Sequence, residues 1–166
     1  MDTTPVPVHM FVRHFFWIML GASVFALAYA LTAQYAFGYE PCLLCQYQRI
    51  PYWTVVGVCL IELCVPGLDR KGAAWIIAAI FACGAALAFY HVGVERHWWQ
   101  AGACAAQAPV SFNFDDFRTA PLKPILKSCD DVDWTLFGLS MATYNVAVSL
   151  ILACVSALAA SRMTKG

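Results

Sequence analysis

Residues Phe15 to Phe37 read FFWIMLGASVFALAYALTAQYAF and carry no charged side chain. A helix needs about 20 apolar residues to cross the hydrocarbon core of a bilayer. Three further apolar stretches follow, at about residues 42–65, 73–94 and 136–160. The sequence therefore predicts an all-α integral membrane protein, a four-helix bundle that forms a single membrane domain over residues 1–166.

The composition supports a membrane protein and argues against nucleic acid as a partner. Hydrophobic residues make up 61% of the chain and charged residues 12%, whereas a soluble domain carries roughly 25% charged residues. The formal net charge is zero, and the lysines and arginines form no run. A nucleic-acid-binding protein needs a basic patch, and this chain offers none.

The first apolar stretch has one alternative interpretation, a cleaved signal peptide. Arg13-His14 precedes it, and Ala28-Tyr29-Ala30 has the small-residue spacing of a cleavage site. The apolar part of a signal peptide is only about 7–15 residues long. Phe15 to Ala33 already gives 19 uncharged residues, so we expect a retained membrane span.

Four spans place both termini on one side of the membrane, and the long segment at about residues 95–135 on the other. Each side carries five basic residues, so their number alone does not orient the chain. On the side of the termini they lie in short tails and a short turn, close to the span ends. The positive-inside rule then favours cytoplasmic termini and a loop outside the cytoplasm. These five residues are Arg13, Arg70, Lys71, Arg162 and Lys165.

The eight cysteines divide by their position relative to the spans. Four fall inside spans, where we expect them to pack as small hydrophobic side chains; they are Cys59, Cys64, Cys83 and Cys154. The other four share the loop side of the membrane; they are Cys42, Cys45, Cys104 and Cys129. Two pairs in an oxidising compartment favour disulfide chemistry. Four cysteines can also hold tetrahedral zinc, but such sites usually have two short-spaced pairs, so we predict no metal.

The pair Cys42 and Cys45 forms a CxxC motif at the start of the second stretch. Pro41 suits the first turn of a helix, and the free N–H groups of that turn lower the pKa of a thiol. Arg49 follows Cys45 by four residues, which places it one helical turn away. We expect Arg49 to stabilise a thiolate or an oxyanion there, and Pro51 to interrupt the helix just inside the membrane.

Two further ionisable residues stand out within the spans. His91 lies near the loop end of the third stretch, four residues before Glu95, and is a candidate proton donor; the alternative is an interfacial histidine bonded to the neighbouring backbone. Glu62 lies deep in the second stretch, towards the side of the termini. An acid inside a membrane is a functional hint, but we expect Glu62 to hydrogen-bond within the bundle.

Together these residues resemble the disulfide bond formation protein B (DsbB) family of bacterial inner membranes. The resemblance covers most of the chain, and one departure is Gln48, where some members carry Glu. The segments that carry it are Pro41–Arg49, Tyr90-His91, Cys104, Cys129, Trp134–Met141 and Tyr144-Asn145.

The resemblance implies a thiol:quinone oxidoreductase that keeps the periplasm oxidising and so supports periplasmic protein folding. A reduced DsbA-like periplasmic protein would attack a Cys104–Cys129 disulfide and form a mixed disulfide through Cys104. Cys129 would then attack Cys42, and Cys45 would pass electrons to a membrane quinone. That quinone, ubiquinone or menaquinone, would be bound near Cys45, Arg49 and His91 and would connect the chain to the respiratory chain.

Three other functions fit parts of the sequence. A quinone-linked thiol enzyme resembling vitamin K epoxide reductase is also a helical bundle with CxxC and loop cysteines, but there the CxxC follows the loop pair. A membrane protein that binds or transports metal would use the cysteines and histidines as ligands. A purely structural bundle would use its disulfides only to brace the loop.

Overall fold

The computed structural model describes residues 8–65, 67–99, 128–132 and 134–163 of the 166-residue chain. Cys104 and most of the predicted loop at 95–135 lie outside the described residues. The described elements are α1 (Val8–Tyr35), α2 (Leu43–Tyr47), α3 (Ile50–Cys64), α4 (Arg70–Glu95), β1 (Thr135–Leu136), β2 (Leu139–Ser140) and α5 (Met141–Arg162).

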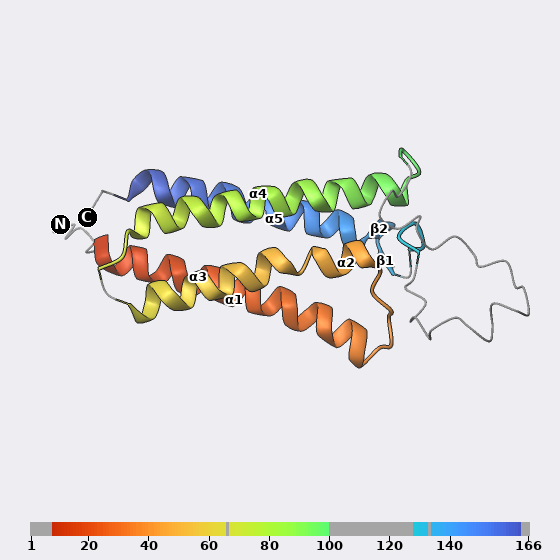
Figure 1. Ribbon diagram of the computed structural model, residues 1–166, viewed down its shortest axis with the longest axis horizontal. Coiled ribbons are helices and arrows are strands. Elements are labelled where there is room, and N and C mark those ends of the chain that lie inside the picture. Colours follow the sequence, from red (N-terminus) through yellow and green to blue (C-terminus); the bar gives the residue numbers. More distant parts are fainter. Residues whose placement is uncertain (1–7, 66, 100–127, 133, 164–166) are drawn as a thin grey trace, which may run out of the picture.

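The helices run alongside one another as an elongated bundle (Figure 1). α1 packs on α3, α3 on α4, and α4 most extensively on α5. The first turn of α1 and the last turn of α5 lie at one end, while α2 and the two short strands lie at the other (Figure 1). Three helices, α1, α4 and α5, are long and apolar enough to cross a membrane.

The distribution of side chains fits a membrane environment. Many large apolar side chains point outward, among them Phe25 at 74% exposure and Ile151 at 61%. Both α4 and α5 bury many small residues, which let membrane helices approach one another closely. The buried small residues of these two helices are Ala73, Ala74, Ala78, Gly84, Ala85, Ala88, Gly93, Ala142, Ser149, Ser156, Ala159 and Ala160.

The second predicted span, 42–65, is not one continuous helix. It consists of the five-residue α2 and the fifteen-residue α3, with Gln48 and Arg49 between them. Pro51 is the second residue of α3, and it lacks the N–H that would continue the hydrogen-bond ladder from α2. The predicted interruption at Pro51 is therefore confirmed, but α3 is too short to count among the three candidate spans, and four spans remain a prediction.

The last predicted span, at 136–160, corresponds to helix α5, which begins later than the predicted boundary at residue 136. β1 and β2 pair antiparallel through Phe137-Gly138, whose positive φ angles of 51° and 76° match the two-residue hairpin turn that follows the twist of the strands. Ser140 then caps α5, because its Oγ accepts a hydrogen bond from Thr143 N. The hairpin thus sets the position at which α5 begins.

Two expectations about residues inside the bundle need correction. Glu62 is buried at 7% exposure, but its Oε2 has no hydrogen-bond partner among the described residues. Of the cysteines expected to pack inside spans, only Cys59 is buried. Cys64, Cys83 and Cys154 are exposed on the outer faces of their helices.

Pro51, at the break between α2 and α3, packs tightly against Gly84 of α4. This contact gives a test of the fold. A Cβ at Gly84 would lie 3.2 Å from Pro51 Cγ. We expect Gly84→Leu to lower the midpoint of thermal unfolding in detergent, because overpacking costs about 1–3 kcal/mol and the proline ring is rigid. Gly57→Leu is the matched control, since a Cβ there meets nothing within 4 Å. Equal losses in both variants would contradict this packing.

Candidate active site

The CxxC pair lies at the end of the bundle opposite to the first turn of α1. Cys42 is the N-cap of α2 and Cys45 lies one turn further on, with 2.9 Å between their sulfurs. Cys42 Sγ accepts a hydrogen bond from Cys45 N at 3.2 Å, the role that a serine or aspartate oxygen usually plays at a cap. Pro41 precedes the cap rather than opening the helix. Cys42 is buried and Cys45 only partly so.

The two thiols differ in acidity because they share a hydrogen bond. The two sulfurs share a hydrogen bond, and chiefly for this reason the pKa of Cys42 is lowered to about 4, although burial acts in the opposite direction. His91 and the N–H of Cys45 contribute to the lowering. The same hydrogen bond and burial raise the pKa of Cys45. The reduced pair therefore carries its thiolate on Cys42.

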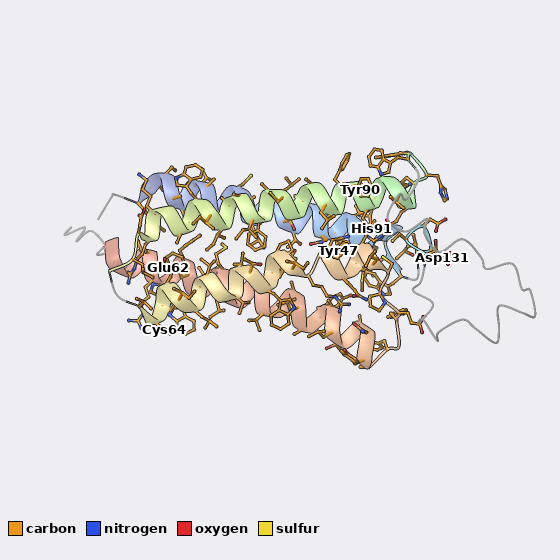
Figure 2. All side chains as sticks on the ribbon, viewed as in Figure 1. Tyr47, Glu62, Cys64, Tyr90, His91 and Asp131 are labelled. Atoms are coloured by element: carbon orange, nitrogen blue, oxygen red, sulfur yellow. The ribbon has the colours of Figure 1, made fainter. Side chains whose placement is uncertain are left out.

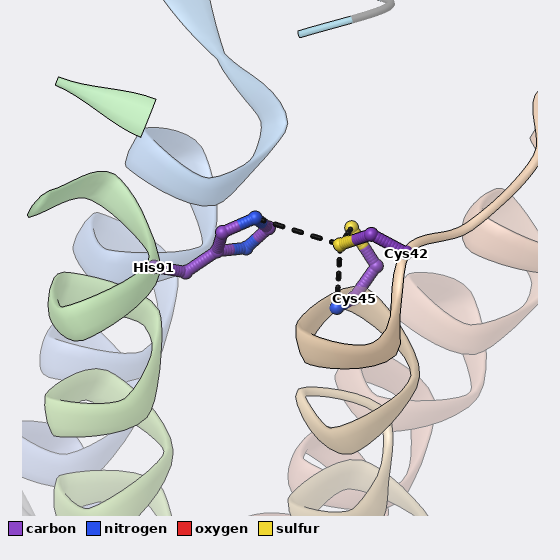
Figure 3. Close-up of side chains that lie close together, drawn as sticks. All are labelled: Cys42, Cys45 and His91. Atoms are coloured by element: carbon purple, nitrogen blue, oxygen red, sulfur yellow. Dashed lines mark hydrogen bonds between the residues drawn. The ribbon is translucent and has the colours of Figure 1, made fainter. Parts of the chain in front are cut away.

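His91 faces this pair from the neighbouring helix α4 (Figure 3). Its Nε2 lies 3.6 Å from Cys42 Sγ and 3.8 Å from Glu95 Oε1. Ser140, the cap of α5, donates to Glu95 Oε2 at 2.5 Å. The imidazole is buried at 3% exposure, so its position is fixed by these groups rather than by water. His91 therefore lies beside Cys42, and its role as a proton donor stays a prediction.

A hydrogen-bond chain that runs in one direction sets the tautomer of His91. Asn145 in α5 donates from Nδ2 to Gln48 Oε1 at 2.5 Å, and the Gln48 amide nitrogen lies 2.6 Å from His91 Nδ1. An amide nitrogen only donates, so Nδ1 accepts. A neutral imidazole then carries its proton on Nε2, the nitrogen that faces Cys42.

The chain begins at Tyr52 and Ser149 in the core of the bundle. Tyr52 Oη donates to Asn145 Oδ1 at 2.5 Å, and Ser149 Oγ donates to the same oxygen at 3.2 Å. Two donors on Oδ1 turn the Asn145 amide nitrogen towards Gln48. The buried chain therefore connects α3 and α5 to the histidine on α4, and each step fixes the orientation of the next.

Cys129 lies beside the same site, although it is distant in sequence. It is disulfide-bonded, 1% exposed, and belongs to one buried cluster with Cys42, Leu44 and Val94. Its backbone hydrogen-bonds to His91. Cys104 lies outside the described residues, so the predicted Cys104–Cys129 pairing remains a prediction.

Arg49 lies between α2 and α3 and turns towards α1. Its Nη1 donates to Gln34 Oε1 at 2.6 Å. Arg49 is not among the groups that shift the pKa of Cys45, which are Cys42, Glu95 and burial. The expected role of Arg49 beside Cys45 therefore stays a prediction.

The sequence did not assign roles to several of these residues. Asn145 was noted only as part of the resemblance, and Gln48 only as a possible hydrogen-bond donor beside the CxxC pair. The available signal was the polar pair Asn145 and Ser149, four residues apart in an otherwise apolar helix. Side chains at this spacing share a face, and polar groups inside a membrane need partners.

The three donor atoms of Cys42, Cys45 and His91 lie within 4.8 Å of one another, so a metal site must be weighed against a dithiol. Two thiolates on tetrahedral zinc, with Zn–S bonds of about 2.3 Å, lie about 3.8 Å apart. The separation here is 2.9 Å, which is a hydrogen-bonded thiol pair. The geometry therefore favours disulfide exchange.

The acidity of Cys42 gives a direct spectroscopic test. Because its pKa is lowered to about 4, the thiolate should persist as the pH falls from 8 to 5, whereas an ordinary thiol is already protonated below about 8.5. Ultraviolet thiolate absorbance of the reduced protein should stay constant over this range. Cys42→Ser should remove the signal, and Cys83→Ser should leave it. A titration midpoint near 8 would contradict the assignment.

Comparison with known proteins agrees with this arrangement. The family model described as "Disulfide bond formation protein DsbB" matches residues 12–159. Disulfide bond formation protein B of Cupriavidus necator is 29% identical, over 84% of this chain and 92% of its own. The protein of the same name from Neisseria meningitidis serogroup A is 30% identical, over 82% of this chain and 88% of its own length.

A Rickettsia prowazekii protein named "Uncharacterized protein RP370" is 28% identical, over 81% of this chain and 80% of its own. No solved structure matches this chain. The family model spans the bundle, the CxxC pair, His91 and Cys129 alike. The chain therefore belongs to the DsbB family of membrane disulfide bond formation proteins.

Proposed function

We propose that this chain reoxidises a DsbA-like periplasmic dithiol protein and delivers the electrons to a membrane quinone through two cysteine pairs. The first pair is Cys104 with Cys129, and the second is Cys42 with Cys45. The enzyme would lie in the bacterial inner membrane with cytoplasmic termini and periplasmic cysteines. The partner dithiol becomes a disulfide, and the quinone becomes a quinol.

The observation that carries this proposal is that Cys129 belongs to the same buried cluster as Cys42. Its backbone also bonds to the histidine that faces Cys42. Thiol–disulfide exchange needs direct attack of a thiolate on a sulfur. A Cys129 thiolate released by the partner therefore has Cys42 as its neighbour, and attack there forms a Cys129–Cys42 bond and releases Cys45.

Completion of the exchange regenerates the loop disulfide and leaves Cys42 and Cys45 reduced. This is the state of the described residues, in which Cys129 is bonded and Cys42 and Cys45 are free. The thiolate then rests on Cys42, and the remaining proton on Cys45. When the pair closes again, two electrons and the Cys45 proton leave together, and a second proton comes from His91 or water.

The surroundings of Cys45 fit a lipid-soluble electron acceptor. A quinone supplies a sink for two electrons and two protons at the membrane. Cys45 is the more exposed sulfur of the pair, and apolar side chains that follow it are exposed, with Ile50 at 56% and Trp53 at 55%. The Arg49–Gln34 pair offers hydrogen-bond donors on the same side, and these residues would hold the acceptor.

The proposal is tested by following oxidation of a reduced DsbA-like protein by membranes that carry this chain, with added ubiquinone or menaquinone. We expect quinone-dependent oxidation. Cys104→Ala should abolish the mixed disulfide with the partner, and Cys45→Ser should abolish quinone turnover. Turnover that survives Cys45→Ser would leave the disulfides only a structural role and would refute the relay.

Arg49 provides a separate test of where the acceptor binds. Arg49→His should raise the apparent KM for quinone while the fold is retained, because histidine lacks the planar array of donors that a guanidinium presents. The measurement is the rate of partner oxidation as a function of quinone concentration. Arg96→His, the same change at an exposed position after α4, is the control. An unchanged KM for Arg49→His would reject this role.

A further inference from the structure

A second polar site lies at the other end of the bundle, far from the CxxC pair. A cavity of about 170 Å³ opens between α1, α3 and the first residue of α4. Its lining residues are Arg13, Phe16, Glu62, Leu63 and Arg70. Figure 2 shows Glu62 at the end of the bundle opposite to His91. A single water needs only about 10–15 Å³, so this cavity accommodates a polyatomic group.

Glu62 is the unusual member of this lining. It is 7% exposed, and its Oε2 has no hydrogen-bond partner among the described residues. Neither Arg13 nor Arg70 forms an ion pair with it within 4.0 Å in that part of the chain. Leaving a buried polar atom without a partner is unfavourable, so a ligand that donates a hydrogen bond to Oε2 would be bound favourably.

The charges around the cavity restrict which ligand fits. Two guanidinium groups attract a phosphate, which they recognise through paired N–H donors, and they repel a simple cation. The carboxylate of Glu62 repels a simple anion but accepts hydrogen bonds from an ammonium group. A ligand that carries both a phosphate and a primary ammonium satisfies all three side chains.

The position of the cavity indicates where such a ligand comes from. Arg13 lies at the start of the apolar stretch of α1, and Arg70 is the first residue of α4. Span ends lie at the level of the lipid headgroups. On α3, Leu60 and Ile61 beside Glu62 are 47% and 56% exposed, and these side chains offer an apolar surface for acyl chains.

We propose that this cavity binds the phosphoethanolamine headgroup of an aminophospholipid, with the phosphate between Arg13 and Arg70 and the ammonium on Glu62. The inference is independent of the redox function, because it uses none of the cysteines. It assigns to the end of the bundle remote from the dithiol a lipid site that joins α1, α3 and α4.

Headgroup selectivity of the intact, delipidated protein tests the proposal. Native mass spectrometry and thermal unfolding are measured with added phosphatidylethanolamine, phosphatidylcholine or phosphatidylglycerol of identical acyl chains. We expect phosphatidylethanolamine to bind about tenfold more tightly than either of the others, because only its primary ammonium donates a charge-assisted hydrogen bond to Glu62. Phosphatidylcholine has the phosphate but no N–H, and phosphatidylglycerol has no ammonium. Equal binding of the three lipids would overturn the proposal.

Variants separate the two halves of the site. Glu62→Gln should abolish the preference for phosphatidylethanolamine over phosphatidylglycerol. Arg70→Gln should weaken the binding of both lipids. Glu40→Gln, at an exposed position before the CxxC pair, should change neither. An unchanged preference in Glu62→Gln would refute the assignment. If Glu62→Gln does not fold, the selectivity of the unaltered protein still decides.

Competition with a soluble compound identifies the source of the headgroup. Free phosphoethanolamine should displace the lipid only weakly, because it lacks the acyl chains that lie on α3. Displacement as effective as that by the lipid itself would support the same recognition chemistry but would identify a soluble ligand and overturn the lipid assignment. If the delipidated protein binds none of the three lipids, the proposal is wrong.

Discussion

Replacing Cys129 with serine is expected to reduce oxidation of the DsbA-like partner to the uncatalysed rate. Serine cannot form the loop disulfide, and its hydroxyl cannot attack Cys42 in place of a thiolate. The acceptor side should remain intact, because Cys42, Cys45 and His91 keep their contacts. Quinone should therefore still oxidise the CxxC pair, which acid trapping followed by alkylation and mass analysis would detect.

The matched control is Cys154→Ser, because Cys154 is a free cysteine exposed on the outer face of α5. It should retain full partner oxidation, which would show that loss of a thiol as such has no effect. Partner oxidation that persists in Cys129→Ser would mean that the partner attacks Cys42 directly. The proposed order of the two pairs would then be wrong.

Replacing Gln48 with leucine should have the next largest effect. Without its amide, nothing holds His91 Nδ1 as an acceptor, so the proton is no longer confined to the Nε2 that faces Cys42. A positioned acid or base contributes about 10²–10⁴-fold, and we expect loss of its orientation to slow turnover by roughly 10²-fold. The thiolate absorbance of Cys42 should also titrate at a higher pH.

Gln46→Leu makes the same chemical change at an exposed position of α2, and should alter neither turnover nor the titration. Gln48→Glu should retain most activity, since a carboxylate at Nδ1 favours an imidazolium that still donates from Nε2. Normal turnover and an unshifted Cys42 titration in Gln48→Leu would show that the hydrogen-bond chain is structural only.

The apolar stretches predicted the helices well, because helix formation in a membrane depends on local composition. The stretches at 15–37 and 73–94 correspond to α1 and α4 with shifts of a few residues at their ends. The residues that open α5 were less predictable. Leu136 and Leu139 belong by hydropathy to the span, but Phe137-Gly138 folds them into a hairpin, and only the glycine hinted at a turn.

The site was predictable where its chemistry is local. Cys42 and Cys45 are three residues apart, so their proximity followed from spacing alone. The contacts of Gln48 with His91 and Asn145 connect residues 43 and 97 positions apart, and such pairs follow only from the packing of three helices. The position of Arg49 beside Gln34 escaped prediction for the same reason.

The unequal lengths of the helices have a consequence for the bilayer itself. α3 has 15 residues and α4 has 26, which at 1.5 Å per residue correspond to ~22 Å and ~39 Å. The hydrocarbon core of a bilayer is about 30 Å thick, so α3 is shorter and α4 is longer than this thickness. The bilayer would therefore become thinner beside α3. Lipid tails would then end close to Cys45, so the hydrophobic thickness of the membrane should influence how readily a lipid-borne oxidant meets that sulfur.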